Sequence, residues 1–429
     1  MLTVAYLANQ FPSALEPYVM EEIAELRRRG VRVITGSVRK PSAEQSPYMR
    51  DFMPELVVLR PFCIFLLPRA LWLCIVRWRQ ISDLVWQIVF QGRESPVQRA
   101  KALLHTWLGG CYAVLLADRH VEHLHVHHGY FGSWIAMIAS RLLGVGFSMT
   151  LHGSDLLVHA AYLDAKLQAC RFCLTISNYN RDYILTHYPR VDADKVIVSR
   201  LGVDAPECTG HAFAGLGAPA SELNLLAVGR LHAVKDHAFL LRACAQLHAR
   251  GFRFECSIAG EGPERRKLES LICKYGLEEK VTLLGHVRRE QMDSLYQRAD
   301  VVVLTSRSEG VPLTLMEAMA HGRIVLAPAI TGIPELVLSG KTGFLYAPGS
   351  MGDFVARLLL IHSLLRAQET SHPPLPSAEK QLDWVRHGAR VQVHHNFDRK
   401  KNLASFTDLL IRRAALQGGS LPDEDLVLQ

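Results

Sequence analysis

The strongest constraint on the fold is a regular alternation of short apolar segments with longer amphipathic ones. In the first half, strand-like segments such as LTVAYLA (2–8) and FSMTLHG (147–153) alternate with helical patterns such as PYVMEEIAELRRRG (17–30). In the second half, the same order recurs from LNLLAVGRL (223–231) to DVVVLTS (300–306). Strands that alternate with crossover helices pair in parallel. The sequence therefore predicts an α/β protein built from open, doubly wound parallel sheets.

The length of the chain and one irregular segment indicate two domains. A chain of 429 residues exceeds what one compact domain usually holds. Periodicity is lost in VDAPECTGHAFAGLGAPAS (203–221), which has the composition of a linker. We expect an N-terminal Rossmann-like domain (1–205), a linker (206–222), a C-terminal Rossmann-like domain (223–383), and terminal helices that pack back toward the first domain (384–429). Ligands of such sheets bind at the carboxyl ends of the strands, so the site is expected in a cleft between the domains.

Composition and charge narrow the class of protein. The formal charge of +7 is modest and dispersed, which disfavours nucleic acid as a partner. The opening MLTVAYLANQFP reads as a strand and lacks the features of a secretory signal, so a cytoplasmic location is expected. Nine cysteines spread along the chain indicate reduced thiols, and the Cys170–Cys173 pair is expected to pack in the core.

The most apolar part of the chain is PFCIFLLPRALWLCIVRWRQISDLVWQIVFQ (61–91). Arginines at 69, 77 and 79 interrupt it, so a bilayer-spanning helix is not expected. Tryptophans beside those arginines suit a helix lying at a membrane interface. The alternative is a set of core helices in a large domain, and both interpretations stay open.

Two carboxylates stand eight positions apart in SRSEGVPLTLMEAMAHG (306–322), at Glu309 and Glu317. The segment predicts a loop that leads into a helix closed by Gly322. The first turn of such a helix offers unpaired N–H groups to a phosphate. Glu309 would then face a sugar, and Glu317 would accept hydrogen bonds from a ribose. Two ordinary surface glutamates would give the same spacing.

The surrounding sequence EGVPLTLMEAMAHGRIVLAPAITGIPELVLSGKTGFLYAPG (309–349) resembles the donor-domain signature of retaining glycosyltransferases with the two-domain GT-B fold, the E-x7-E type of family 4. The resemblance implies that Glu309 contacts the donor sugar and Glu317 the ribose of the nucleotide. It also implies a phosphate-binding helix start formed by Gly310, Val311 and Pro312.

Four further residues take roles from this resemblance. LLAVGRLHAVKDHAFLLRA matches an element in which Arg230 and Lys235 would neutralise the donor diphosphate. Paired cations can stabilise that leaving group without a metal. SMTLHGSDLL matches an H-x-x-D region, which puts His152 near the donor sugar and Asp155 in the donor site. We therefore expect no metal and no cofactor other than the donor itself.

A histidine-rich stretch, HLHVHHGYFG, raises the question of a metal site at His125, His127 and His128. No acidic or cysteine partner stands at ligand spacing in the sequence, and related proteins carry H-x-H-x-G there without a required metal. The stretch IAGEGPERRKLE lacks the third glycine of a dinucleotide fingerprint, since Arg265 stands in its place, so NAD is disfavoured.

QFPSALEPYVMEEIAEL (10–26) resembles a subgroup linked to bacterial exopolysaccharide assembly, including colanic-acid-type transferases. Ser13, Glu16, Glu21 and Glu22 keep the outline of that motif, while Leu15 and Pro17 depart from it. The expected activity is transfer of a hexosyl group, with retention, from a nucleotide diphosphate sugar to a saccharide or lipid-linked acceptor. A sugar-nucleotide epimerase of the same architecture and a non-catalytic assembly subunit remain as alternatives.

Overall fold

The computed structural model describes residues 1–13, 16–41, 47–53, 55–60, 65–91, 94–157, 161–204, 222–370 and 378–415. The chain divides into two compact units. Unit 1 contains Met1–Thr175, Arg181–Ser199 and the residues from Leu403 onward, and unit 2 contains Ile176–Asn180 and Arg200–Asn402. Of the predicted linker 206–222, every residue but Glu222 lies outside the described part of the chain.

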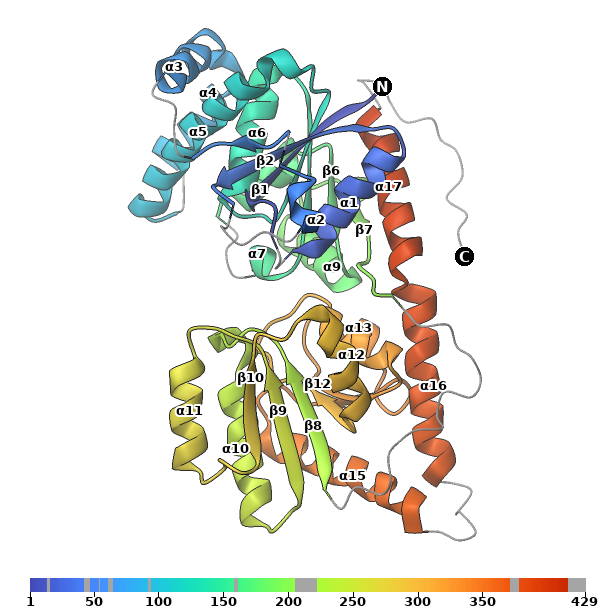
Figure 1. The fold of residues 1–429 in the computed structure, drawn as a ribbon. Helices are drawn as coiled ribbons and strands as arrows, with labels where there is room; N and C mark the ends of the chain where they lie inside the picture. Colours follow the sequence, from blue (N-terminus) through green and yellow to red (C-terminus); the bar gives the residue numbers. More distant parts are fainter. Residues whose placement is uncertain are drawn as a thin grey trace. The chain divides into compact units, whose positions relative to one another are not determined.

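Among the described residues, unit 1 contains one parallel sheet in the order β3-β2-β1-β4-β5-β6-β7 (Figure 1). Its strands are β1 (Thr3–Gln10), β2 (Arg32–Arg39), β3 (Val57–Val58), β4 (His123–His127), β5 (Gly146–Leu151), β6 (Phe172–Thr175) and β7 (Val196–Val198). Its helices are α1 (Pro17–Arg28), α2 (Pro47–Arg50), α3 (Leu66–Val76), α4 (Ser82–Trp86), α5 (Pro96–Leu116), α6 (Phe131–Leu143), α7 (Ser154–Leu157), α8 (Leu163–Ala169), and most of α9 (Asn178–His187) and α17 (Arg399–Ala415).

Successive side chains of a strand point to opposite faces of the sheet, and both faces of this sheet pack against helices. On β1, Ala5 and Leu7 join a core with α5 and α6. Val4 and Tyr6 join a second core that includes residues of α1 and Phe406 of α17. Figure 1 shows α1 and α17 on one side of the sheet and α5 and α6 on the other.

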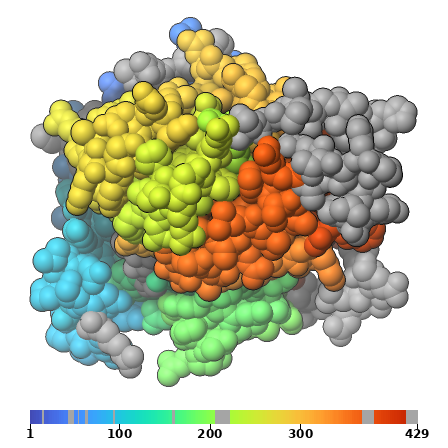
Figure 2. Space-filling model, turned by 90° about the horizontal axis from the view of Figure 1, so that it is seen from below, coloured from blue at the N-terminus to red at the C-terminus, as the bar shows by residue number. Residues whose placement is uncertain are grey.

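Unit 2 repeats the arrangement, and its described residues form a parallel sheet in the order β10-β9-β8-β11-β12-β13. The strands are β8 (Leu223–Val228), β9 (Phe254–Ala259), β10 (Val281–Gly285), β11 (Val301–Val303), β12 (Ile324–Pro328) and β13 (Phe344–Tyr346). The helices are α10 (His237–Ala249), α11 (Arg265–Lys274), α12 (Arg289–Arg298), α13 (Leu313–Ala320), α14 (Ile333–Leu336), α15 (Met351–Thr370) and α16 (Ala378–Asn396). Figure 2 shows α10 in yellow-green beside α15 in orange, and both pack on one face of the sheet.

The two sheets confirm the predicted doubly wound parallel architecture. In each, the strand order reverses direction beside the first strand, between β1 and β4 and between β8 and β11. Ligands of open α/β sheets bind at the carboxyl ends of the strands at this switch point. The loops after β4, β8 and β11 are therefore the places to look for chemistry.

The apolar segment predicted at 61–91 forms α3, two short helical turns, η1 (Trp78–Gln80) and η2 (Gln87–Gln91), and α4; residues 61–64 lie outside the described part. One face of it is buried, as Ala70 and Ile88 show, while Trp72 is 68% exposed. Among the described helices, Pro96–Arg119 alone has the length and apolar character to cross a bilayer, and half of that apolar window is buried.

Candidate active site

The switch point of unit 2 brings together two of the predicted site residues. Lys235 ends a short helical turn after β8, and Glu309 lies in the loop after β11. Nζ of Lys235 donates a hydrogen bond to Oε1 of Glu309 at 2.6 Å, and Oγ of Ser306 donates to the same oxygen at 2.6 Å. The side chain of Arg230, in the loop between β8 and Lys235, is exposed. The loops thus present a cation and a paired carboxylate at the edge of the sheet where ligands bind.

Two glycines explain how the loop after β8 is held. A Cβ atom on Gly260 would lie 2.0 Å from the carbonyl oxygen of Gly229, and one on Gly262 would lie 2.4 Å from that of Leu231. The backbone N–H of Leu231 also donates to the carbonyl of Glu261 at 2.9 Å. The GEG stretch, which lacked the pattern of a dinucleotide site, therefore permits close packing of two backbone segments beside Arg230.

The segment Gly310, Val311 and Pro312 leads directly into α13, which begins at Leu313. Val311 and Pro312 are buried, so this short loop is fixed in place. Oγ1 of Thr331 donates to the carbonyl of Glu309 at 2.5 Å, which ties the loop to the one that follows β12. The free N–H groups in the first turn of a helix attract anions. This helix start suits a phosphate group.

Glu317 lies within α13 and is bonded to a residue that sequence reasoning missed. The hydroxyl of Tyr296, on α12, donates to Oε2 of Glu317 at 2.7 Å. Burial raises the pKa of Glu317 above its ordinary value, and the bond from Tyr296 partly offsets that shift. Tyr296 is fully buried. No motif in the sequence links it to Glu317, because the two meet only when α12 packs beside α13.

In unit 1, Asp155 holds two loops together. Its carboxylate oxygens accept hydrogen bonds from the backbone N–H groups of Gly129 at 2.9 Å, His152 at 3.0 Å and Gly153 at 2.7 Å. Asp155 is completely buried. Burial favours its neutral form, but hydrogen bonds and charge from His128 outweigh this and hold its pKa below the usual range. Asp155 thereby fixes the loop after β4 against the loop after β5, where His152 lies.

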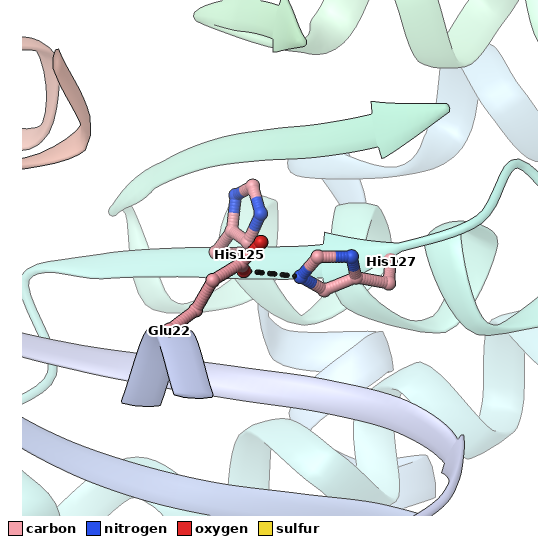
Figure 3. A group of neighbouring side chains, drawn as sticks. All are labelled: Glu22, His125 and His127. Atoms are coloured by element: carbon pink, nitrogen blue, oxygen red, sulfur yellow. Dashed lines mark hydrogen bonds and ion pairs between the residues drawn. The ribbon is translucent and has the colours of Figure 1, made fainter. Parts of the chain in front are cut away.

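The histidine stretch has an acidic partner that lies far away in the sequence rather than at ligand spacing within it. Helix α1 brings Glu22 to His127, with Oε2 of the carboxylate 2.8 Å from Nε2 of the ring (Figure 3). The other nitrogen of His127, Nδ1, lies 3.0 Å from Nε2 of His152. Sequence spacing could not reveal this contact, since more than a hundred positions separate Glu22 from His127. The only signal was the exopolysaccharide-type motif that contains Glu22.

Glu22, His125 and His127 form a group whose donor atoms lie within 4.8 Å of one another, a separation that could accommodate a metal ion. Both nitrogens of His125 are already bonded, however, to Oγ of Ser148 at 2.8 Å and to Oγ1 of Thr150 at 3.1 Å. Burial holds the pKa of His125 well below its ordinary value, so the ring is neutral. Metal binding would break several of these bonds, and we expect hydrogen bonding to be the role of this group.

Unit 1 also contains a cavity of about 280 Å³ beside the loop after β4. Its lining is mostly apolar and aromatic, with two lysines, and includes Lys101, His105, Tyr130, Trp134, Tyr162 and Lys166. The buried Nζ of Lys166 donates to the carbonyl of Gly129 at 2.7 Å. Burial lowers the pKa of Lys166 to about 7. A pocket of this kind suits an organic ligand with a polar or anionic group.

Comparison with known proteins finds a family model that matches part of the chain. Residues 211–372 match the model of the family described as glycosyl transferases group 1. The chain is 37% identical over 171 residues to the putative colanic acid biosynthesis glycosyltransferase WcaL of Salmonella typhimurium, covering 38% of this chain and 41% of that protein. It is 33% identical over 174 residues to the amylovoran biosynthesis glycosyltransferase AmsK of Erwinia amylovora, covering 39% and 42%. The matched part thus spans less than half the length of these relatives.

Solved structures match over nearly the full chain and show its fold. A sucrose-phosphate synthase from Thermosynechococcus elongatus superposes with a TM-score of 0.70 at 16% identity, covering 97% of this chain and all of that one. The Anabaena protein HepE in complex with UDP-glucose gives a TM-score of 0.66 at 17% identity, covering 96% of this chain and all of that one. These likenesses confirm the predicted GT-B fold.

Proposed function

We propose that the protein is a retaining glycosyltransferase, because residues 211–372 match the model of the glycosyl transferases group 1 family. It transfers a hexosyl group from a nucleotide diphosphate sugar to a saccharide or lipid-linked acceptor. The observation that carries the proposal is the contact of Lys235 with Glu309 at 2.6 Å. Both residues lie on loops at the switch point, and the loop of Glu309 leads directly into α13.

The proposed mechanism depends on positioning and charge. Lys235, Arg230 and the start of α13 bind the diphosphate and stabilise the negative charge that grows on it as the sugar departs. Glu309 orients the sugar, and Glu317 accepts hydrogen bonds from the ribose. His152 contacts a sugar hydroxyl, while Asp155 holds its loop. The departing phosphate assists the incoming hydroxyl on the same face, which accounts for retention. No metal is required in this scheme.

Calorimetric titration with UDP, GDP and ADP in the presence of EDTA tests the donor site. UDP is the first choice because the solved neighbour HepE holds UDP-glucose. We expect one nucleotide to bind, and Glu317→Ala to weaken its binding by about tenfold or more, because it removes hydrogen bonds to a charged group. Glu309→Ala should leave nucleotide affinity within about twofold and lower turnover instead. Glu264→Ala, which removes a surface carboxylate bonded to Lys267, is the matched control.

Two outcomes would replace the proposal. Conversion of the donor into an isomeric sugar nucleotide without acceptor would identify an epimerase. No binding of any nucleotide, with or without added magnesium, would favour a non-catalytic assembly subunit. Equal and negligible effects of Glu317→Ala and Glu309→Ala would remove the assigned roles. Binding that EDTA abolishes would show that the donor site requires a metal.

The names of the relatives support a place for this reaction in exopolysaccharide biosynthesis, and we propose that the protein works at the cytoplasmic face of the membrane. Unit 1 carries an exposed apolar surface, the α3–α5 surface, formed by Phe65, Leu71, Trp72, Ile75, Val76, Trp78, Trp86, Phe90, Val97, Leu103 and Leu104. Arg69, Arg79 and Lys101 are exposed among these residues. Exposed aromatic and aliphatic side chains flanked by cations suit the interface of an anionic bilayer.

Flotation with lipid vesicles tests this membrane contact. The protein should float with vesicles that contain phosphatidylglycerol, and the double variant Trp72→Glu, Ile75→Glu should lose most of that binding. Trp384→Glu is the matched control, because Trp384 is 66% exposed on α16 and Trp72 is 68% exposed on α3. Equal loss in both variants, or no binding of the unmodified protein, would contradict the assignment of the α3–α5 surface to lipid.

A further inference from the structure

A buried chain of hydrogen bonds in unit 1 leads from α1 to the loop after β5. Glu22 is bonded to Nε2 of His127 at 2.8 Å, and Nδ1 of His127 is bonded to Nε2 of His152 at 3.0 Å. Glu22 and His127 are 5% and 3% exposed, whereas His152 is half-buried. Figure 3 shows the first link, with Glu22 reaching from α1 to His127 on β4. These hydrogen bonds thus connect two buried side chains, Glu22 and His127, to one that a ligand can reach, His152.

The two hydrogen bonds favour one arrangement of the protons. An ionised carboxylate can only accept, so Glu22 requires the proton on Nε2 of His127. A ring that carries one proton, on Nε2, has Nδ1 as an acceptor, so the proton in the second bond then belongs to Nε2 of His152. Burial, with the nearby His128 and His127, holds the pKa of His152 well below its ordinary value, so this ring is neutral. Its remaining nitrogen, Nδ1, carries a lone pair.

We propose that Glu22 and His127 are positioning residues, which hold His152 in the tautomer protonated at Nε2 so that its Nδ1 accepts a hydrogen bond from a sugar hydroxyl. The inference rests on the proposed function, since the sugar is the ligand of that reaction. The hydrogen bond that one ring nitrogen makes sets the state of the other. Tyr18 supports the ring of His152 from the side, with centroids 4.9 Å apart.

Nuclear magnetic resonance tests the tautomer without substrate. In the full chain labelled with ¹⁵N histidine, long-range ¹H–¹⁵N spectra should show His127 and His152 as neutral rings protonated at Nε2, assigned by the signals lost in His127→Phe and His152→Gln. Glu22→Gln keeps the size of the side chain, but its amide can donate or accept. His152 should then populate both tautomers. Glu25→Gln removes a carboxylate that is bonded to Arg28 and Arg29 on the same helix, and should change neither ring.

Kinetics provide the second measurement. Glu22→Gln and His127→Phe should lower kcat for sugar transfer by about tenfold to a hundredfold, the usual effect of losing a hydrogen bond to a charged group. KM for the donor and the affinity for its nucleotide should stay within about twofold, because the proposed nucleotide contacts lie in unit 2. Glu25→Gln should leave kcat unchanged.

Three results would overturn the inference: a proton on Nδ1 of His152 in the unmodified protein, stoichiometric zinc in the purified protein, or a Glu22→Gln variant with unchanged tautomer and unchanged kcat. The spectrum of the unmodified protein shows which nitrogen of His152 carries the proton, even if a variant fails to fold. Failure of the proposed function is recorded separately, as absence of nucleotide binding or of sugar transfer, and leaves the tautomer measurement intact.

Discussion

His128 lies between two carboxylates and in an unusual backbone conformation. Its φ angle is 72°, in the left-handed region that few residues other than glycine and asparagine adopt readily. Nε2 lies 2.9 Å from Oε1 of Glu16, and Nδ1 lies 3.6 Å from Oδ2 of Asp155. Burial lowers the pKa of His128, but Asp155 and Glu16 outweigh burial and raise it to about 9. The ring is therefore charged at neutral pH.

This raised pKa predicts how stability depends on pH. Since the folded pKa of about 9 exceeds the ordinary value, the contribution of His128 is fully present below about pH 6.5 and is lost as the pH rises through 9. The contribution is on the order of 3 kcal/mol. Chemical denaturation from pH 6 to 10 should show the free energy of unfolding falling in this window. His128→Asn, which tolerates the left-handed backbone, should flatten that fall.

The exposed histidine of α9 is the control for this experiment. Nδ1 of His187 donates a hydrogen bond to the carbonyl of Tyr183 at 2.9 Å, and the side chain is exposed. His187→Asn should keep the full decline between pH 6.5 and 9. If the free energy of unfolding of His128→Asn declined by the same amount, the decline would belong to other groups.

Individual side chains divide into those that the sequence can predict and those that it cannot. Lys235 and Glu309 are recognisable from the motifs around them, and the structure places them 2.6 Å apart. Tyr296 and Glu22 were missed as partners of Glu317 and His127, because their contacts join helices and strands distant in sequence. Such contacts depend on how elements pack, which a local pattern does not record.

Among the elements, helix packing depends on glycines that have no visible pattern in the sequence. A Cβ atom on Gly109 of α5 would lie 2.5 Å from Cβ of Ile138 on α6, and one on Gly110 would lie 2.8 Å from Sγ of Cys74 on α3. The middle of α5 is therefore held closely between two neighbouring helices. This packing accounts for the apolar composition of α5. The same composition and length are what would allow the segment Pro96–Arg119 to cross a bilayer.

Two helical glycines of unit 2 give a matched test of such packing. A Cβ atom on Gly388 of α16 would lie 2.4 Å from the carbonyl oxygen of Lys341, whereas one on Gly352 of α15 meets nothing within 4 Å. Gly388→Ala should lower the free energy of unfolding by about 1–3 kcal/mol, because the helix must shift. Gly352→Ala should leave it unchanged or raise it by up to about 1 kcal/mol. Denaturant unfolding measures both, and equal effects would contradict the close contact.

Strands were the elements that the sequence predicted best, since buried parallel strands leave short continuous apolar runs such as Val301–Val303. The apolar helices were harder, because the same composition suits a core or a lipid surface. In α3 the two faces differ, since Ala70 is buried and Trp72 is 68% exposed. Packing against α5 covers the buried face of α3.

At the level of the full chain, the net charge of +7 predicts how the proposed membrane contact responds to salt. Exposed charges are largely screened once the Debye length falls to about 3 Å near 1 M salt. Binding to anionic vesicles should weaken several-fold between about 0.05 M and 0.5 M salt, while an apolar contribution from the α3–α5 surface persists. Vesicle flotation at several salt concentrations measures this. Complete release by salt would show that charge alone holds the protein on lipid.

The path of the chain between the units has a consequence for how the protein is made. Unit 1 includes residues from Leu403 onward, and Phe406 and Leu410 of α17 complete the core that contains Val4 and Tyr6 of β1. The ribosome finishes this helix only after all of unit 2 has been synthesised. On the face that α1 and α17 share, the part that α17 covers therefore stays exposed through most of translation, and early folding must proceed with that apolar surface open to chaperones or to aggregation.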